Sequence, residues 1–135
     1  MKTLAAFLVV TLVALAGTAA RGEPPPEQDY ALYCMGCHQR DGAGFSGRVP
    51  PLRDVDRLLR VPDGRAYLVR VPGVAHASLS NERLAILLNW VLTEFGTSGF
   101  PPYTAKEVGP LRTKSFINAA AARRALVLRL GRRAE

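Results

Sequence analysis

The most regular hydrophobic pattern in the chain lies between Ser80 and Phe95. Apolar residues recur there at intervals of three and four, so they share one face of a helix. They are Leu84, Leu87, Leu88, Val91, Leu92 and Phe95. Ser80 is a residue type that caps helix N-termini, Glu82 suits the positive end of the helix dipole, and Gly96 is typical of the residue after a helix. The pattern predicts an amphipathic helix over residues 80–95 with its apolar face in the core.

Shorter patterns on either side of this helix predict further helices separated by glycine and proline breaks. Helices are expected over residues 27–35, 54–60 and 118–130, and residues 65–71 favour a short helix over a strand. The expected breaks are the loop of Gly42, Gly44 and Gly47, then Pro50-Pro51, Pro62-Asp63-Gly64, Pro72-Gly73 and Pro101-Pro102. No pattern typical of a parallel sheet is present, so the expected fold class is all-α.

Residues 1–20 have the layout of a secretory signal peptide. A positive start at Met1-Lys2 precedes an apolar run from Leu4 to Ala16, and small residues follow up to Ala20. The apolar run is about 13 residues long, whereas a helix that spans a bilayer needs about 20. We therefore expect export and cleavage near Ala20 rather than a retained membrane anchor. The remainder divides into a domain over 21–99 and an extension over 100–135.

The formal net charge of +7 is concentrated in the extension. Residues 23–110 contain nine basic and ten acidic side chains, whereas residues 111–135 contain seven basic and one acidic. Basicity confined to the tail of an exported chain argues against nucleic-acid binding, which favours a basic domain. Three alternatives remain for the tail: a helix packed on the domain with its arginines in solvent, a docking element for an acidic partner, or a helix on a membrane surface.

The segment Y-C-M-G-C-H contains both cysteines of the chain, Cys34 and Cys37, and one of its two histidines, His38. Two thiols one helical turn apart can capture both vinyl groups of a haem, and a histidine directly behind them is placed under the iron. This C-x-x-C-H spacing is typical of covalent haem attachment. A domain of under about 80 residues also gains stability from a bulky cofactor. We therefore expect one covalent haem c with His38 as an iron ligand.

Three other uses of the same residues are weaker. A thioredoxin-like redox pair needs a βαβ frame, which the pattern does not predict. A structural disulfide suits an exported protein but gives His38 no role. A zinc site would need Cys34, Cys37, His38 and His76 in one tetrahedron, and the adjacent Cys37 and His38 fit that geometry poorly.

Around this motif, over roughly residues 28–95, the chain resembles the class I c-type cytochromes. The resemblance rests on a helix leading into C-M-G-C-H, the loop D-G-A-G, the segment V-P-P-L and a final helix opened by L-S-N-E. It implies a small cytochrome c fold in which Cys34 and Cys37 carry the thioethers and His38 is the proximal ligand. It also implies that the carbonyl of Pro50 accepts a hydrogen bond from the other ring nitrogen of His38, which fixes the tautomer.

The resemblance implies a function as well: a periplasmic monohaem protein that carries single electrons. Its expected donor is a periplasmic dehydrogenase, and its expected acceptor is the respiratory chain. No acid/base constellation beyond His76 is visible, so we do not expect an enzyme. In the family the first and last helices cross beside the haem, which would bring Tyr30 or Tyr33 near Trp90.

The second axial ligand departs from the family pattern. The family usually supplies a methionine shortly before the last helix, but this chain has only Met1 and Met35. Met1 leaves with the signal peptide, and Met35 lies inside the attachment motif on the proximal side. The segment 70–80 offers His76 instead. Three outcomes stay open: His76 binds the iron, it lies nearby and leaves an open site for gas-binding or peroxidase-like chemistry, or it faces solvent.

Overall fold

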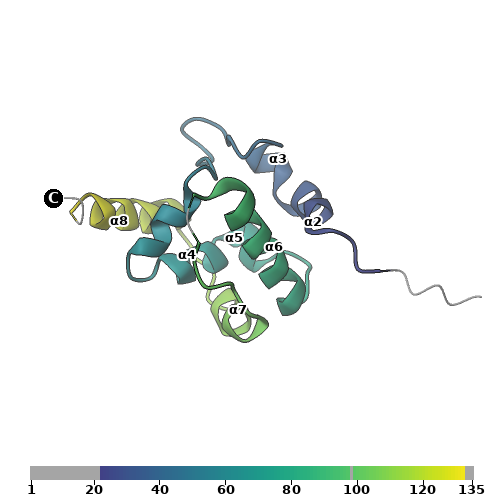
Figure 1. Cartoon of the computed structure of the whole chain (residues 1–135). Coiled ribbons are helices and arrows are strands. Elements are labelled where there is room, and N and C mark those ends of the chain that lie inside the picture. Colours follow the sequence, from purple (N-terminus) through teal and green to yellow (C-terminus); the bar gives the residue numbers. More distant parts are fainter. Residues whose placement is uncertain (1–21, 98, 133–135) are drawn as a thin grey trace, which may run out of the picture.

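The computed structural model describes residues 22–97 and 99–132 (Figure 1), so the predicted signal peptide lies outside the described residues. The elements are α2 (Pro26–Tyr33), α3 (Met35–His38), the 3-10 helix η1 (Val55–Arg60), α4 (Gly64–Arg70), α5 (Pro72–Ala75), α6 (Asn81–Phe95), α7 (Ala105–Arg112) and α8 (Ala119–Gly131). The described ranges contain no strand, only an isolated antiparallel bridge between Phe45 and Val49. The expected all-α class is therefore confirmed.

The helix predicted over residues 27–35 forms as two pieces. Pro26 occupies the first turn of α2, where its missing N–H costs no hydrogen bond. The backbone leaves helical geometry at Cys34, which has φ −123° and serves both as the end of α2 and as the cap of α3. Gln39, with φ 62°, then ends α3 immediately after the histidine. The break places the two cysteines and His38 on their own short turn.

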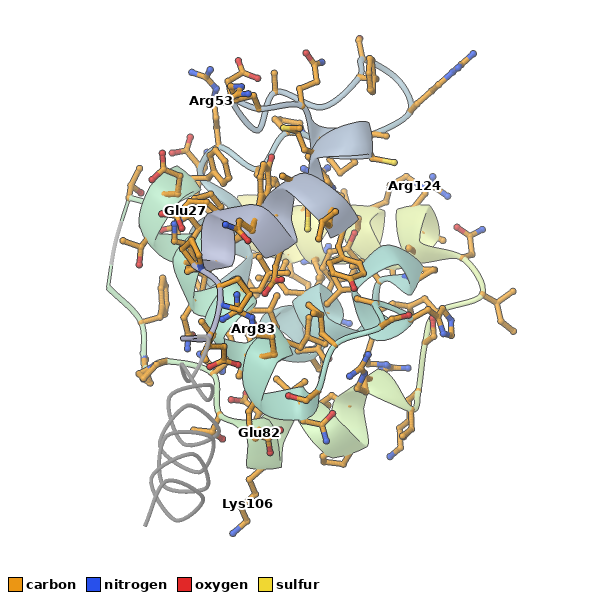
Figure 2. All side chains as sticks on the ribbon, turned by 90° about the vertical axis from the view of Figure 1, so that its right-hand side faces the viewer. Glu27, Arg53, Glu82, Arg83, Lys106 and Arg124 are labelled. Carbon is orange, nitrogen blue, oxygen red and sulfur yellow. The ribbon has the colours of Figure 1, made fainter. Side chains whose placement is uncertain are left out.

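Helix α6 forms as the sequence predicts. The Ser80 side chain accepts a hydrogen bond from the amide of Arg83 at 3.1 Å, which caps the first turn. Four residues of the predicted apolar face are buried: Leu84, Leu87, Leu88 and Val91. Arg83 is itself buried and pairs with the buried carboxylate of Asp29, and Figure 2 shows it between α6 and α2. This ion pair ties α2, and with it the cysteine turn, to the central helix.

The structure adds two short helices to those predicted. The break expected at Pro72-Gly73 is confirmed, because α4 ends at Arg70 and Val71 is extended, but Pro72 also begins α5, since proline is well suited to the first turn of a helix. No helix was predicted between residues 100 and 117, where α7 forms. Thr104 caps α7 by accepting from the amide of Glu107 at 3.2 Å. The T-x-x-E spacing was the available signal, but Gly109 and Pro110 inside the helix obscured it.

The main hydrophobic core surrounds α6 and includes residues from beyond position 99. Tyr103 and Val108 are 3% and 0% exposed and belong to the same buried cluster as Tyr30 and Leu84. In Figure 1, α7 lies beneath α6, with α2 and α3 to one side. The domain boundary predicted at residue 99 stays a prediction, but the first part of the extension packs as part of the core.

Helix α8 packs against a second, smaller cluster. Asn118 caps it by accepting from the amide of Ala121 at 2.9 Å, close to the predicted start. Leu126 is buried against Leu58, Val61 and Tyr67, which come from η1, α4 and the segment between them. In Figure 1 α8 lies on the opposite side of the molecule from α2. The tail therefore packs on the domain, as the first of its three alternatives predicts.

Across residues 22–97 and 99–132, no helix combines the length and the apolar character needed to cross a bilayer.

Candidate functional site

The two cysteines and His38 lie on one helical turn. The amide of Cys37 donates to the carbonyl of Cys34 at 3.1 Å, and the amide of His38 donates to the same carbonyl at 2.8 Å. Cys37 is exposed, Cys34 is partly buried, and their sulfurs are not joined in a disulfide. The turn therefore presents two unbonded sulfurs and an imidazole from neighbouring positions, which is the donor set that covalent haem attachment requires.

The environment of Cys34 opposes thiol redox chemistry. Burial raises the pKa of the Cys34 thiol to about 11, and the charges of Asp29 and Cys37 add to the rise. A catalytic thiol of a thioredoxin-like pair needs a lowered pKa, because the thiolate is the nucleophile. The described part of the chain also lacks the strands of a βαβ frame. The raised pKa and the absence of strands in the described residues therefore give no support to the thioredoxin-like alternative.

The zinc alternative also finds no support. Among the described residues, no three or more His, Cys, Asp or Glu side chains gather closely enough to hold a metal ion by themselves. The arrangement at positions 34, 37 and 38 therefore does not extend to a fourth ligand of a tetrahedral zinc site.

His38 is the ring that would bind iron, and its surroundings keep it neutral. Burial lowers the pKa of His38 below its ordinary value of 6.5, while the neighbouring carbonyl of Pro50 acts in the opposite direction. Nδ1 is buried without a hydrogen-bond partner among the described residues, so Pro50 is a close neighbour of the ring. The neutral imidazole is the form that coordinates metals. With Nδ1 buried beside a carbonyl, Nε2 is the nitrogen left for the iron.

The loop of Gly42 and Gly44 makes this approach of Pro50 possible. The amide of Leu52 donates to the carbonyl of Gly42 at 2.8 Å, and Gly44 has φ +69°. A Cβ at Gly44 would strike the carbonyl of Val49 and lie 2.8 Å from the carbonyl of Pro50. The sequence marked these glycines only as a loop; the positive φ and the close contact show that Gly44 sets the path of the Pro50 segment.

Tyr30 anchors the far side of the same turn. Its hydroxyl donates to the carbonyl of Gln39 at 2.6 Å, and its ring lies 5.2 Å from that of Trp90 and 5.4 Å from that of Phe95, centroid to centroid. The contact between Tyr30 and Trp90 joins the first helix to α6, as the resemblance implied. An aromatic residue four positions before Cys34 was the signal for this role in the sequence.

His76 lies at the end of α5, in the segment that leads to α6. It is exposed, and none of the described residues hydrogen-bonds its imidazole. The segment nevertheless lies beside the cysteine turn, because the Tyr33 hydroxyl donates to the carbonyl of Ser78 at 3.4 Å. Val74 and Leu79 also pack against the core cluster that Cys34 joins. Ligation of iron by His76 stays a prediction.

Comparison with known proteins gives the family of the chain. No model of a known protein family matches the chain. A cytochrome c-552 from one strain of Thermus thermophilus is 34% identical over 138 aligned residues, which cover 85% of this chain and 88% of the relative. Another cytochrome c-552 from Thermus thermophilus is 35% identical over 106 residues, 62% of this chain and 81% of the relative. The chain belongs to this family of c-type cytochromes, electron carriers whose single haem c is attached covalently through two cysteines.

Proposed function

We propose that this cytochrome is exported to the periplasm and carries single electrons from a periplasmic dehydrogenase to the respiratory chain. The observation that carries the proposal is the turn of Cys34, Cys37 and His38 with the carbonyl of Pro50 behind the imidazole. When attached, the haem supplies one iron that takes up and releases one electron. The apolar run in residues 1–20 supports export.

Each residue of the turn has a separate task. Cys34 and Cys37 hold the porphyrin by covalent bonds, so it cannot dissociate during turnover. His38 provides a neutral nitrogen to the iron, and the Pro50 carbonyl fixes the orientation of the ring and increases its basicity. The core around Tyr30, Trp90 and Phe95 excludes water from the adjoining side and keeps the site rigid. Rigidity suits electron transfer, because little has to rearrange when the charge changes.

His76 is our proposed sixth ligand. Two facts support it: the chain has no methionine outside Met1 and Met35, and the His76 imidazole is free of protein partners among the described residues. A second imidazole does not raise the reduction potential of the haem iron as thioether sulfur does. The reduction potential of this protein should therefore lie below that of a relative with histidine and methionine ligands. The optical spectrum of both oxidation states, recorded with and without carbon monoxide, tests this. Ready binding of carbon monoxide by the reduced protein would favour an open site and gas-binding or peroxidase-like chemistry instead.

An acidic redox partner fits the charge of the tail. Arg124 and Arg132 are exposed, and Figure 2 shows Arg124 projecting outward from α8. Opposite charges accelerate the encounter of redox proteins and make it sensitive to salt. Replacing both arginines by glutamine should slow electron exchange with the partner at low salt and reduce its salt dependence. Arg57→Gln, on η1, is the control, because it removes an exposed charge from another element.

The decisive experiment for the cofactor uses expression of the full chain in a host that attaches haem c. The purified protein should keep its colour after denaturation and extraction with acidic acetone, and the Cys34→Ala/Cys37→Ala variant should lose it. Recovery of the protein in the periplasmic fraction, cleaved near Ala20, tests export. A colourless wild type would contradict the proposal, as would retention of the chain in the cytoplasm.

A further inference from the structure

The side chain of Arg112, the last residue of α7, donates to three backbone carbonyls of one short segment. Its Nε donates to Ala75 at 3.1 Å, its Nη1 to Leu79 at 2.7 Å, and its Nη2 to Ala77. Nη1 also lies 3.4 Å from Oδ1 of Asn81, the first residue of α6. One guanidinium therefore joins every second carbonyl from the end of α5 to the start of α6.

These carbonyls bracket His76. Ala75 and Ala77 are its two neighbours in the chain, and Arg112 binds both of them. The segment between α5 and α6 belongs to no regular helix, and its own backbone hydrogen bonds run from the amides of His76, Ala77 and Leu79. Of the two other carbonyls in this run, that of Ser78 accepts a hydrogen bond from the hydroxyl of Tyr33 at 3.4 Å. The backbone around His76 is thus held from the side of α7 and from the side of the cysteine turn.

The position of Arg112 is itself well defined. Val108, one helical turn earlier, is fully buried in the main core. At Gly109 a Cβ would lie 3.0 Å from Nδ2 of Asn81, so α7 runs close to the first residue of α6 at this point. The guanidinium is a planar fork with five donors, and such a fork loses little freedom when it binds several acceptors. Arg112 is therefore a rigid support rather than a loose surface charge.

We propose that Arg112 is a positioning residue that fixes the backbone of residues 75–79 and thereby holds His76 toward the iron. This inference rests on the proposed function, because it takes His76 as the sixth ligand. It gives the first part of the extension a task at the haem site, which the charge pattern of the sequence did not indicate. Lysine at this position would keep the charge but could not reach three carbonyls at once.

The test uses the complete haem-loaded protein and its Arg112→Ala and Arg112→Lys variants. Hydrogen exchange of the amides of residues 76–80 should become faster by on the order of ten-fold or more in Arg112→Ala, and by less in Arg112→Lys. The rate at which carbon monoxide binds the reduced protein should rise in the same order. Exchange in α2 and α3 should stay unchanged. Unchanged exchange at 76–80, or faster exchange with unchanged carbon monoxide binding, would overturn the inference.

The matched control is Arg65→Ala. Arg65 holds the same extension, through a paired contact with Glu107 at 2.7 and 2.8 Å and a hydrogen bond to the carbonyl of Pro101 at 2.7 Å, but it does not touch residues 75–79. We expect Arg65→Ala to lower overall stability and to leave carbon monoxide binding as in the wild type. An equal effect of both variants would mean general loosening of the extension and would contradict a specific role of Arg112.

A His76→Ala variant separates this inference from the proposed function. If His76→Ala leaves the spectrum unchanged, the ligand proposal fails whatever Arg112 does. If His76→Ala alters the spectrum while Arg112→Ala alters neither exchange nor carbon monoxide binding, the ligand proposal stands and only the role of Arg112 is overturned.

Discussion

The amide of Gly44 donates a hydrogen bond to the carbonyl of His38 at 3.1 Å, and this bond closes the loop that brings Pro50 back to the proximal histidine. The amide of Phe45 continues the closure by donating to the carbonyl of Val49 at 2.9 Å. The loop can close this tightly because residue 44 has no side chain that would collide with the carbonyls of Val49 and Pro50. The surroundings of His38, the predicted iron ligand, therefore depend on a glycine six residues away from it.

Gly44→Ala should lower the free energy of unfolding by about 3 kcal/mol or more, because strain at positive φ adds to a backbone collision. Displacement of the Pro50 carbonyl should also change the reduction potential, since the ring of His38 loses its partner. Thermal unfolding and potentiometric titration of the haem-loaded variant measure the two effects.

Gly47→Ala is the matched control for this variant. Gly47 has a similar φ of +74°, but a Cβ there would meet nothing within 4 Å. It should therefore show only the conformational cost, about 1–2 kcal/mol, with the potential unchanged. Equal losses of stability in the two variants would show that the contact with Val49 and Pro50 is unimportant.

His76→Met should raise the reduction potential by on the order of 0.1 V, because thioether sulfur favours ferrous iron more than imidazole does. The optical spectrum of the oxidised protein should change with it. Ser78→Met, two residues further along the same exposed segment, is the control and should leave the potential where it was. A potential that does not respond to His76→Met would argue against a ligand at this position.

Single replacement of either cysteine should leave the haem attached through one thioether. Cys34→Ser and Cys37→Ser should each keep some haem bound after denaturing electrophoresis, whereas the double variant should release all of it. Because Cys34 is partly buried and Cys37 is exposed, we expect Cys34→Ser to reduce the yield of folded protein more. Haem staining of the gel measures attachment; full retention in the double variant would contradict covalent capture by these thiols.

Val108→Ala should cost about 2 kcal/mol of unfolding free energy, because Val108 is 0% exposed and its loss leaves a small cavity in the main core. Ile117→Ala, in the same extension, is the control: Ile117 is 106% exposed, so its truncation should change stability by less than about 0.5 kcal/mol. Denaturant unfolding of both variants gives the comparison. Indistinguishable midpoints would mean that α7 is an appendage and not part of the core.

The pH dependence of stability at the alkaline end should report Tyr30. Burial raises the pKa of Tyr30 from 10.0 to about 12, with smaller contributions from Cys34 and Asp41. Because the folded state holds the phenolic proton more tightly, this contribution to stability is complete below about pH 10 and is lost as the pH rises toward 12. Tyr30→Phe should be less stable at neutral pH, by about 1 kcal/mol, through loss of the hydrogen bond to Gln39.

The same variant should also lose less stability than the wild type between pH 10 and 12. Thermal unfolding across that range provides the measurement. If stability falls equally with pH in the two proteins, groups other than Tyr30 cause the alkaline loss of stability. The buried Tyr67 and Tyr103 are the candidates, because burial raises the pKa of both.

The elements that the sequence predicted well are those whose signals are local. Residues 80–95 show one face of a helix by their spacing alone, and Ser80 marks its start. The cysteine turn is also local, because Cys34, Cys37 and His38 need only one helical turn to come together. The helix at 105–112 escaped prediction because its own glycine and proline argue against it, while burial of Val108 stabilises it from outside.

By itself, the sequence determined the haem c cofactor and the helical class, and it predicted His38 as the proximal ligand, since each depends on residue types at short, fixed spacing. The tertiary structure decided which distant groups lie together: it places the Pro50 carbonyl, which only the family resemblance had suggested, beside His38, and Arg112 on the backbone around His76, 33 to 37 residues from the carbonyls it binds. The physical reason is that a carbonyl or a guanidinium has no preferred partner in the sequence. Its partner is selected only when packing and glycine-permitted turns bring two segments together and leave no water to compete.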